Sequence, residues 1–357
     1  MIFLDIAGLL PPVKIAICIV FSKSIIAAFE KSLSSGLSEL YTMIFLFFAL
    51  DWWGKKIEED EAKRMLKKAY DLGINFFETG DMYGKGKSER LIGEVFKDMR
   101  DEVVISTKYG YDFSEVEQIG HKELPQKFDE DFTRKALRNS LERLQTDHLD
   151  MYGPHNPKLN HIRDDSIFNL LDSFIEDKSI RTYQVALGPA IGWTQEGIEA
   201  MDRPNVSAVQ TVYNILEQTP GNELMKKAQE KDVGILVRVP EASGILTGKV
   251  NAETKIDEKD HRSVRKGEWI KASLEKVEKL KPIAERNDLT ITELSMKFIM
   301  SKKGFASVFP TVVSEEEIVN YVEMTKGGYI SASDMKEIEE LYNTWPSYEL
   351  KATPQTS

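Results

Sequence analysis

The sequence predicts a (β/α)8 barrel preceded by an atypical N-terminal extension. Short apolar runs alternate with amphipathic segments from residue 57 onwards, and such alternation indicates parallel strands joined by helical crossovers. Eight strand–helix units in about 290 residues match the size of a closed barrel. An open Rossmann-like sheet is the alternative, but no Gly-x-Gly-x-x-Gly stands between a strand and a helix.

The strands of the barrel are expected in short apolar segments. The first is MIFLFFAL, residues 43–50, and the seven others are INFFE, EVVISTK, DHLDMYG, IRTYQVAL, VSAVQTVY, VGILVRV and FASVFP. The strands are thus predicted to be short and buried on both faces, as parallel barrel strands are.

The helices are expected where apolar residues recur at helical spacing. The first begins near residue 57, where acidic residues open the segment and a glycine follows it. Those between the later strands are SERLIGEVFKDM, FTRKALRNSLERLQT, DDSIFNLLDSFIEDK, TQEGIEAM and GNELMKKAQEKD. A long polar insertion is expected over residues 240–266. After it come helices near 267–286 and 290–302 and the segments SEEEIVNYVEMT and SASDMKEIEELYNTW.

Three segments are expected along the chain. Residues 43–345 form the barrel with the cofactor and substrate site, residues 1–42 form an extension of unknown role, and residues 346–357 form a C-terminal tail. Lys14 and Lys23 interrupt the apolar stretches of the extension, which are shorter than the ~20 residues of a membrane-spanning helix. A basic start with a small-residue cleavage site is also missing. We therefore expect neither a membrane anchor nor a secretory signal.

The composition excludes several classes of function. The 357 residues carry a net charge of −11, which argues against binding to nucleic acid. A single cysteine, Cys18, cannot form an internal disulfide, and the five histidines are scattered, so no metal site is expected. A reducing, cytoplasmic location follows as the default.

Polar residues stand at the predicted strand ends, where barrel enzymes carry their catalytic groups. Glu78 ends one strand, Lys108 the next, and His155 follows the third, while Tyr83 lies in a glycine-rich turn after Glu78. Each has an ordinary explanation on its own: a carboxylate can cap a helix, and a lysine can neutralise it.

Together these four residues suit proton transfer to a carbonyl oxygen. Tyrosine is a weak acid near neutral pH because its pKa is about 10. A nearby Lys108 ammonium would stabilise the phenolate and lower that pKa, and Glu78 would keep the lysine charged and in place. A neutral His155 could donate a hydrogen bond that orients the carbonyl as hydride arrives at its carbon.

The segments that carry these residues resemble the aldo-keto reductases over about residues 51–343. They are GINFFETGDMYGKGKSERLIG, EVVISTKYG, RLQTDHLDMYGPHNP, VQTVYNILEQ, VRVPEASGILTGK and VFPTVVSEEEI. The resemblance implies a barrel that binds an extended nicotinamide cofactor without a Rossmann domain. It places the catalytic tetrad on Tyr83, Lys108, His155 and Glu78.

The resemblance also implies a set of cofactor-binding residues. Gln210 would bind the nicotinamide carboxamide, the loop from Arg238 to Lys249 would follow the pyrophosphate, and the turn at Thr311 to Glu317 would face the adenosine. The residues concerned are Gly188, Gln210, Arg238, Pro240, Gly244, Leu246, Gly248, Lys249, Thr311 and Glu317.

The chain departs from the family pattern at several of these positions. Glu78 stands where the family has Asp, residues 187–189 (LGP) replace a Ser-Asn pair that binds the carboxamide, and Arg238 replaces an aromatic residue. The first strand lacks the usual glycines. Residues 315–317 are all glutamate, which disfavours a 2′-phosphate. NADP(H) is still expected ahead of NAD(H), because most of the family uses it.

Three functions are compatible with the sequence. The leading one is an NAD(P)H-dependent oxidoreductase that reduces small aldehydes or ketones with Tyr83 as general acid. The alternative is a non-catalytic or weakly active nicotinamide-binding regulatory subunit or redox sensor, similar to potassium-channel beta subunits. A lyase that forms a Schiff base on Lys108 ranks third. Neither the substrate nor the oligomeric state can be predicted from the sequence.

Overall fold

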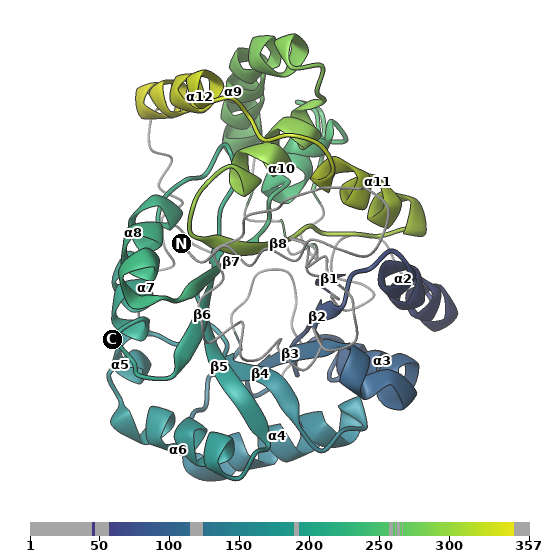
Figure 1. Ribbon diagram of the computed structural model, residues 1–357, viewed down its shortest axis with the longest axis vertical. Coiled ribbons are helices and arrows are strands. Elements are labelled where there is room, and N and C mark those ends of the chain that lie inside the picture. The colour runs from purple at the N-terminus through teal and green to yellow at the C-terminus, as the bar shows by residue number, and fades with distance from the viewer. Residues whose placement is uncertain are drawn as a thin grey trace, which may run out of the picture.

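The eight predicted strands form one parallel sheet that curls into a barrel (Figure 1). The computed structural model describes residues 45–46 (backbone only), 57–114, 124–188, 193–256, 260, 262, 265 and 267–345. Each strand pairs in parallel with the next in chain order. The strands are β1 (Phe45–Leu46), β2 (Phe76–Glu78), β3 (Val104–Tyr109), β4 (Leu149–Pro154), β5 (Ile180–Ala186), β6 (Val206–Val212), β7 (Gly234–Arg238) and β8 (Phe305–Phe309).

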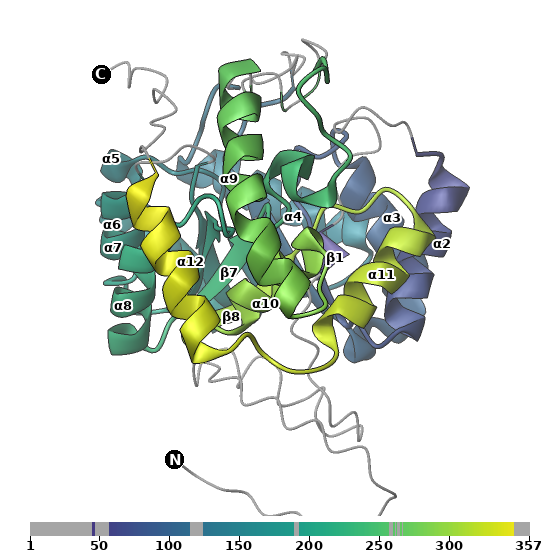
Figure 2. The same cartoon turned by 90° about the horizontal axis from the view of Figure 1, so that it is seen from above.

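The helices surround the strands (Figures 1 and 2). They are α2 (Glu59–Asp71), α3 (Lys87–Phe96), α4 (Glu130–Leu144), α5 (Leu159–Ile162), α6 (Asp165–Glu176), α7 (Thr194–Ala200), α8 (Gly221–Lys231), α9 (Gly267–Arg286), α10 (Ile291–Met300), α11 (Glu315–Thr325) and α12 (Ala332–Thr344), with 3-10 segments η1 (Lys97–Glu102) and η2 (Ala242–Thr247). All helices predicted after residue 57 are confirmed. Figure 2 shows α9 and α12 next to each other on the outside of the barrel.

Two short elements differ from the prediction. Helix α5 has only four residues, too few to produce a periodic pattern. Segment η2 lies within the expected polar insertion, yet most of its residues are buried, and Ser243 and Gly244 have positive φ angles of 56° and 95°. Composition alone does not reveal such a turn, because its conformation comes from packing against α9 and α10.

The first strand is only partly described. Phe45 pairs with Phe77 and Leu46 with Glu78, so β1 lies inside the predicted segment 43–50. The rest of that segment, the 1–42 extension and the 346–357 tail lie outside the described residues, and the predicted boundaries of all three remain untested. Among the described helices, none combines the length and apolarity needed to cross a bilayer.

Apolar side chains fill two regions. One lies between the strands and the helices; helix α2, for example, turns Ala62, Met65, Leu66 and Ala69 inward. The other lies inside the barrel and includes Phe76 and Phe309. Full burial of a large apolar side chain contributes about 1.5–3 kcal/mol, so these layers hold the strand ends rigidly enough to position a site.

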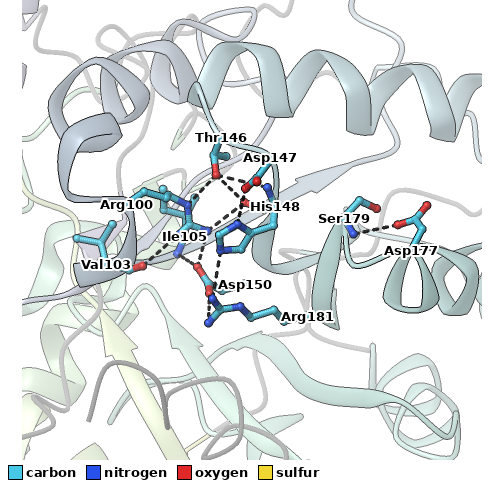
Figure 3. A network of polar contacts seen from close by, with 10 residues as sticks. All are labelled: Arg100, Val103, Ile105, Thr146, Asp147, His148, Asp150, Asp177, Ser179 and Arg181. Carbon is cyan, nitrogen blue, oxygen red and sulfur yellow. Dashed lines mark hydrogen bonds and ion pairs between the residues drawn. The ribbon is translucent and has the colours of Figure 1, made fainter. Parts of the chain in front are cut away.

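A charged network ties together the amino-terminal ends of three neighbouring strands (Figure 3). The Asp150 carboxylate, near the start of β4, accepts a hydrogen bond from Arg100 at 2.7 Å and from the Ile105 amide at 2.9 Å. Arg181, at the start of β5, lies 2.9 Å from its other oxygen. This network belongs to the end of the barrel opposite the carboxyl ends, the end that in this fold serves stability rather than catalysis.

Candidate functional site

Glu78 and Lys108 form a buried ion pair at the carboxyl ends of β2 and β3. The Lys108 ammonium donates to the two Glu78 carboxylate oxygens at 2.7 and 2.9 Å and to the Thr79 carbonyl oxygen at 2.6 Å. Neither Glu78 nor Lys108 is exposed. A lysine ammonium has three N–H groups, so these three acceptors match its full donor capacity.

Tyr83 lies directly beside this pair. The turn after β2 is compact, since a Cβ at Gly80 would come within 3.2 Å of the Tyr83 ring. The Lys108 nitrogen lies 4.6 Å from the centre of that ring. The imidazole of His155 meets the ring edge-on with 5.7 Å between ring centres. The predicted tetrad is therefore assembled in one place.

The electrostatics of Tyr83 differ from the prediction. Burial is the largest cause that raises the pKa of the phenol well above its usual value, and the negative charge of Glu78 raises it further. The charge of Arg238 acts in the opposite direction. Burial lowers the pKa of Lys108, partly offset by Glu78. The net shift of the phenol pKa is thus upward, opposite to the lowering expected from Lys108.

Two glutamines complete the polar cluster inside the barrel. The Gln210 amide nitrogen, on β6, donates at 2.6 Å to Glu78 and at 2.6 Å to the side-chain oxygen of Gln184, on β5. Gln184 in turn donates to the Ser106 hydroxyl at 2.6 Å and lies 3.4 Å from Glu78. All four side chains are fully buried.

Gln184 and Ser106 are site residues that the sequence analysis missed. A signal was present, because Gln184 is a polar residue in the middle of the buried strand segment IRTYQVAL. Asp81 is a third such residue: it is buried two residues before Tyr83, and burial raises its pKa well above the usual value.

Arg238 reaches from the end of β7 across to the end of β5. It donates to the carbonyl oxygen of Leu187, and burial lowers its pKa. The neighbouring Gly188 is packed against Trp193, since a Cβ there would lie 2.1 Å from the indole. Gly188 thus leaves room for a tryptophan, a role different from the predicted cofactor contact, which stays a prediction.

The predicted phosphate and adenosine loops are joined to each other by two contacts. The buried Glu241 accepts from the Thr311 hydroxyl at 2.6 Å. Lys249 forms an ion pair with Glu317, whose other oxygen accepts from the Val313 amide at 2.7 Å. Burial raises the pKa of Glu241 to about 7. Two side-chain contacts therefore connect the loops after β7 and β8.

The other predicted cofactor residues lie in the same loop after β7. The Pro240 carbonyl accepts from Ser295 at 2.9 Å, and the Leu246 carbonyl accepts from Thr292 at 2.7 Å. Gly244 and Gly248 have φ angles of 95° and 72°, a backbone region that glycine enters without strain. These contacts fix the backbone of the loop and leave its predicted role in cofactor binding untested.

Two side chains outside the tetrad make ring-to-ring contacts. Tyr111, from the loop after β3, meets the His155 ring edge-on at 5.1 Å, and Asn156 donates to its hydroxyl at 2.8 Å. His161 is half-buried in α5, with its ring 4.6 Å from that of Phe128. Over the described residues, no three His, Cys, Asp or Glu side chains are grouped to hold a metal ion.

Two of the buried polar atoms that lack a hydrogen-bond partner among the described residues belong to predicted cofactor-binding side chains. These are the side-chain oxygen of Gln210, an acceptor, and Nε of Arg238, a donor. Buried polar groups are normally paired. Two such atoms beside Tyr83 and Glu78 fit a site in which a polar ligand completes the bonding.

Comparison with known proteins agrees with this geometry. An aldo-keto reductase from Schizosaccharomyces pombe, named yakc [NADP(+)], is 30% identical over 294 residues, covering 79% of this chain and 82% of that protein. A probable voltage-gated potassium channel subunit beta from Oryza sativa is 25% identical over 286 residues, covering 75% and 82%.

The fold has known counterparts as well. The holo form of aldo-keto reductase AKR11C1 from Bacillus halodurans superimposes with a TM-score of 0.69, at 22% identity, over 84% of this chain and 91% of that one. At that identity the likeness bears on the fold alone. The model of the Aldo/keto reductase family matches residues 47–343, which confirms the resemblance seen in the sequence. The chain belongs to the aldo/keto reductase family of oxidoreductases.

Proposed function

We propose that this protein reduces a small aldehyde or ketone to the alcohol, with Tyr83 as the proton donor and a nicotinamide cofactor as the reductant. The observation that carries the proposal is the convergence of Tyr83, Lys108, His155 and Glu78 at the carboxyl ends of β2, β3 and β4. Cofactors of this class supply hydride to the carbonyl carbon. A cytoplasmic location belongs to the proposal and is supported by the single cysteine.

Each residue has a defined task in this proposal. Tyr83 gives its proton to the carbonyl oxygen, and His155, edge-on to the phenol ring, orients that oxygen. Lys108 places its ammonium 4.6 Å from the centre of the ring, where its charge would oppose the burial that disfavours the phenolate left behind. Glu78 holds the Lys108 ammonium in place through their hydrogen bond. Tyr83 is only 3% exposed, so its hydroxyl would act in a site shielded from solvent.

The chain offers suitable groups for the cofactor at both ends of the site. The unpaired oxygen of Gln210 would accept from the carboxamide, and Nε of Arg238 would donate to a carboxamide or phosphate oxygen. The loop over residues 240–249, joined to Thr311 and Glu317, would carry the phosphates and the adenosine.

We propose NADP(H) ahead of NAD(H) as the cofactor. The name of the fission yeast relative, which includes NADP(+), supports this choice. Three glutamates in the first turn of α11 act against it, since they repel a 2′-phosphate. The preference is therefore expected to be small.

The proposal is tested by measuring binding and turnover in the full-length protein. NADPH and NADH are titrated separately by fluorescence, and oxidation of each is followed by absorbance with a panel of small aldehydes and ketones. Saturable binding of at least one cofactor and carbonyl-dependent oxidation are expected. Absence of carbonyl-dependent oxidation with either cofactor would overturn the proposal.

A second candidate is a nicotinamide-binding regulatory subunit or redox sensor with little turnover. Two observations favour it: the three N–H groups of Lys108 are directed away from the phenol, and burial raises the pKa of Tyr83. The similarity to a probable potassium-channel beta subunit is consistent with it. Tight cofactor binding without oxidation by any carbonyl, together with co-purification of a partner, would favour this candidate.

A further inference from the structure

Gln184 occupies a central place in the buried polar cluster although no catalytic role requires it. Its side chain contacts three others that come from different strands: Gln210 on β6, Ser106 on β3 and Glu78 on β2. It therefore links strands that lie on different sides of the barrel interior. Because Gln184 is fully buried, every polar atom that it presents is directed at another protein group.

The chemistry of Glu78 sets the direction of the hydrogen bonds. Its carboxylate, which forms an ion pair with Lys108, accepts hydrogen bonds, so the Gln210 group that faces it is the NH2 end of the amide. The two N–H groups of Gln210 then go to Glu78 and to the oxygen of Gln184, each at 2.6 Å. As a result, Gln210 has no donor left, and its own oxygen remains as a buried acceptor.

We propose that Gln184 is a positioning residue that fixes the Gln210 amide so that it presents only an acceptor to the nicotinamide carboxamide, and that it couples this contact to the Glu78–Lys108 pair. The inference rests on the proposed function, since it requires a nicotinamide cofactor at Gln210. The N–H of the carboxamide would be the only group that Gln210 recognises. A cofactor analogue that has an acetyl group in place of the carboxamide offers no such N–H.

The coupling to catalysis follows from the same contacts. Glu78 accepts from Lys108, Gln210 and, at 3.4 Å, Gln184. Removing Gln184 leaves one N–H of Gln210 without an acceptor, so that the amide can turn and Glu78 loses lateral support. A displacement of about 1 Å at a catalytic group can lower turnover by up to roughly 100-fold.

The test uses Gln184→Met, which keeps the length of the side chain but makes no hydrogen bonds. The matched control is Gln218→Met, because Gln218 is equally buried and its side chain donates to the Ile215 carbonyl at 3.3 Å and accepts from Asn222 at 3.3 Å, with no hydrogen bond to Glu78. For each variant we measure kcat, KM and the ratio of dissociation constants for the cofactor and for its 3-acetylpyridine analogue.

We expect Gln184→Met to lower kcat by about 10-fold or more and to bring the ratio of the two dissociation constants closer to one. Gln218→Met should change neither kcat nor this ratio. Ser106→Ala, a smaller change that removes the hydroxyl contacting Gln184, should act in the same direction and serves if Gln184→Met does not fold. An unchanged ratio and kcat in Gln184→Met, or equal effects in Gln218→Met, would overturn the inference. If the wild-type protein bound neither cofactor, the proposed function itself would fail first.

Discussion

The Lys108 ammonium binds both carboxylate oxygens of Glu78, at 2.7 and 2.9 Å, in a place where neither side chain is exposed. The pair links β2 to β3 at the end of the barrel that carries the tetrad. Burial disfavours both charges, and only their mutual attraction and the surrounding amides offset this cost. Stability and catalysis are therefore tied to the same two groups.

Lys108→Met should destabilise the protein strongly, because it leaves the Glu78 carboxylate buried without a cation. Breaking one partner of a buried pair costs about 3–5 kcal/mol. The double variant Glu78→Gln/Lys108→Met removes both charges and should recover most of that loss. Urea unfolding of the wild type, both single variants and the double variant measures the coupling. Additive costs would show that the two charges do not depend on each other.

Glu241 should make the folded state less stable as the pH rises from about 4.5 to about 7. Burial raises its pKa to about 7 from an ordinary value of 4.5. Between these values the folded state holds a proton that the unfolded state releases, so the free energy of unfolding falls with rising pH, by at most about 3 kcal/mol. Among the groups that face Glu241, the charge of Glu317 adds to the shift, and Lys249 is paired with Glu317.

The variant that isolates this effect is Glu241→Gln, which keeps an acceptor for Thr311 but cannot ionise. Its stability relative to wild type should be greater at pH 8.5 than at pH 5.5, as measured by thermal or urea unfolding. The exposed Glu316→Gln, in the neighbouring helix turn, should show the same difference at both pH values. An equal difference for Glu241→Gln at both pH values would contradict the expectation.

Asp150→Asn should weaken the fold and leave turnover intact. The change removes the negative charge shared by Arg100 and Arg181 (Figure 3). Because both arginines are partly exposed, we expect a loss of about 2–3 kcal/mol, less than for a fully buried pair. The control is Asp177→Asn in the same region, whose carboxylate is exposed and accepts from the Ser179 amide. A loss of kcat in the folded Asp150 variant would contradict its structural role.

Glu316→Lys should increase affinity for NADPH relative to NADH. The change replaces an exposed negative charge in the first turn of α11 with a positive one. Exposed charge pairs contribute up to about 1 kcal/mol, so a gain of roughly 3- to 5-fold is expected at low salt and less at high salt. Glu323→Lys, near the other end of α11, should have no such effect. Equal changes in affinity for NADPH and NADH would show that the 2′-phosphate does not lie near the first turn of α11.

Much of the fold could be predicted because barrel strands and helices carry strong local signals. The alternation of INFFE, EVVISTK and the amphipathic segment FTRKALRNSLERLQT depends on burial periodicity, and the structure follows it. The turn over residues 242–247 could not be predicted, since its positive φ angles at Ser243 and Gly244 leave no periodic pattern in the sequence.

The candidate site could be predicted only for residues that stand at the ends of predicted strands. Glu78, Lys108 and His155 each follow an apolar run, so the sequence places them at one rim. The roles of Gln184 and Ser106 depend on contacts between strands that are far apart in the chain, and no local pattern encodes such contacts. The direction of the pKa shift of Tyr83 was missed for the same reason, because burial is set by the whole barrel.

The central claim is that Tyr83 supplies the proton to a carbonyl. The most direct measurement compares the wild type with Tyr83→Phe at saturating reduced cofactor, after fluorescence titration has shown equal cofactor binding. General acid catalysis contributes about 10²- to 10⁴-fold, so we predict a loss of at least about 100-fold in the rate of carbonyl reduction by Tyr83→Phe. Reduction at the wild-type rate by a Tyr83→Phe protein that binds cofactor normally would contradict the account.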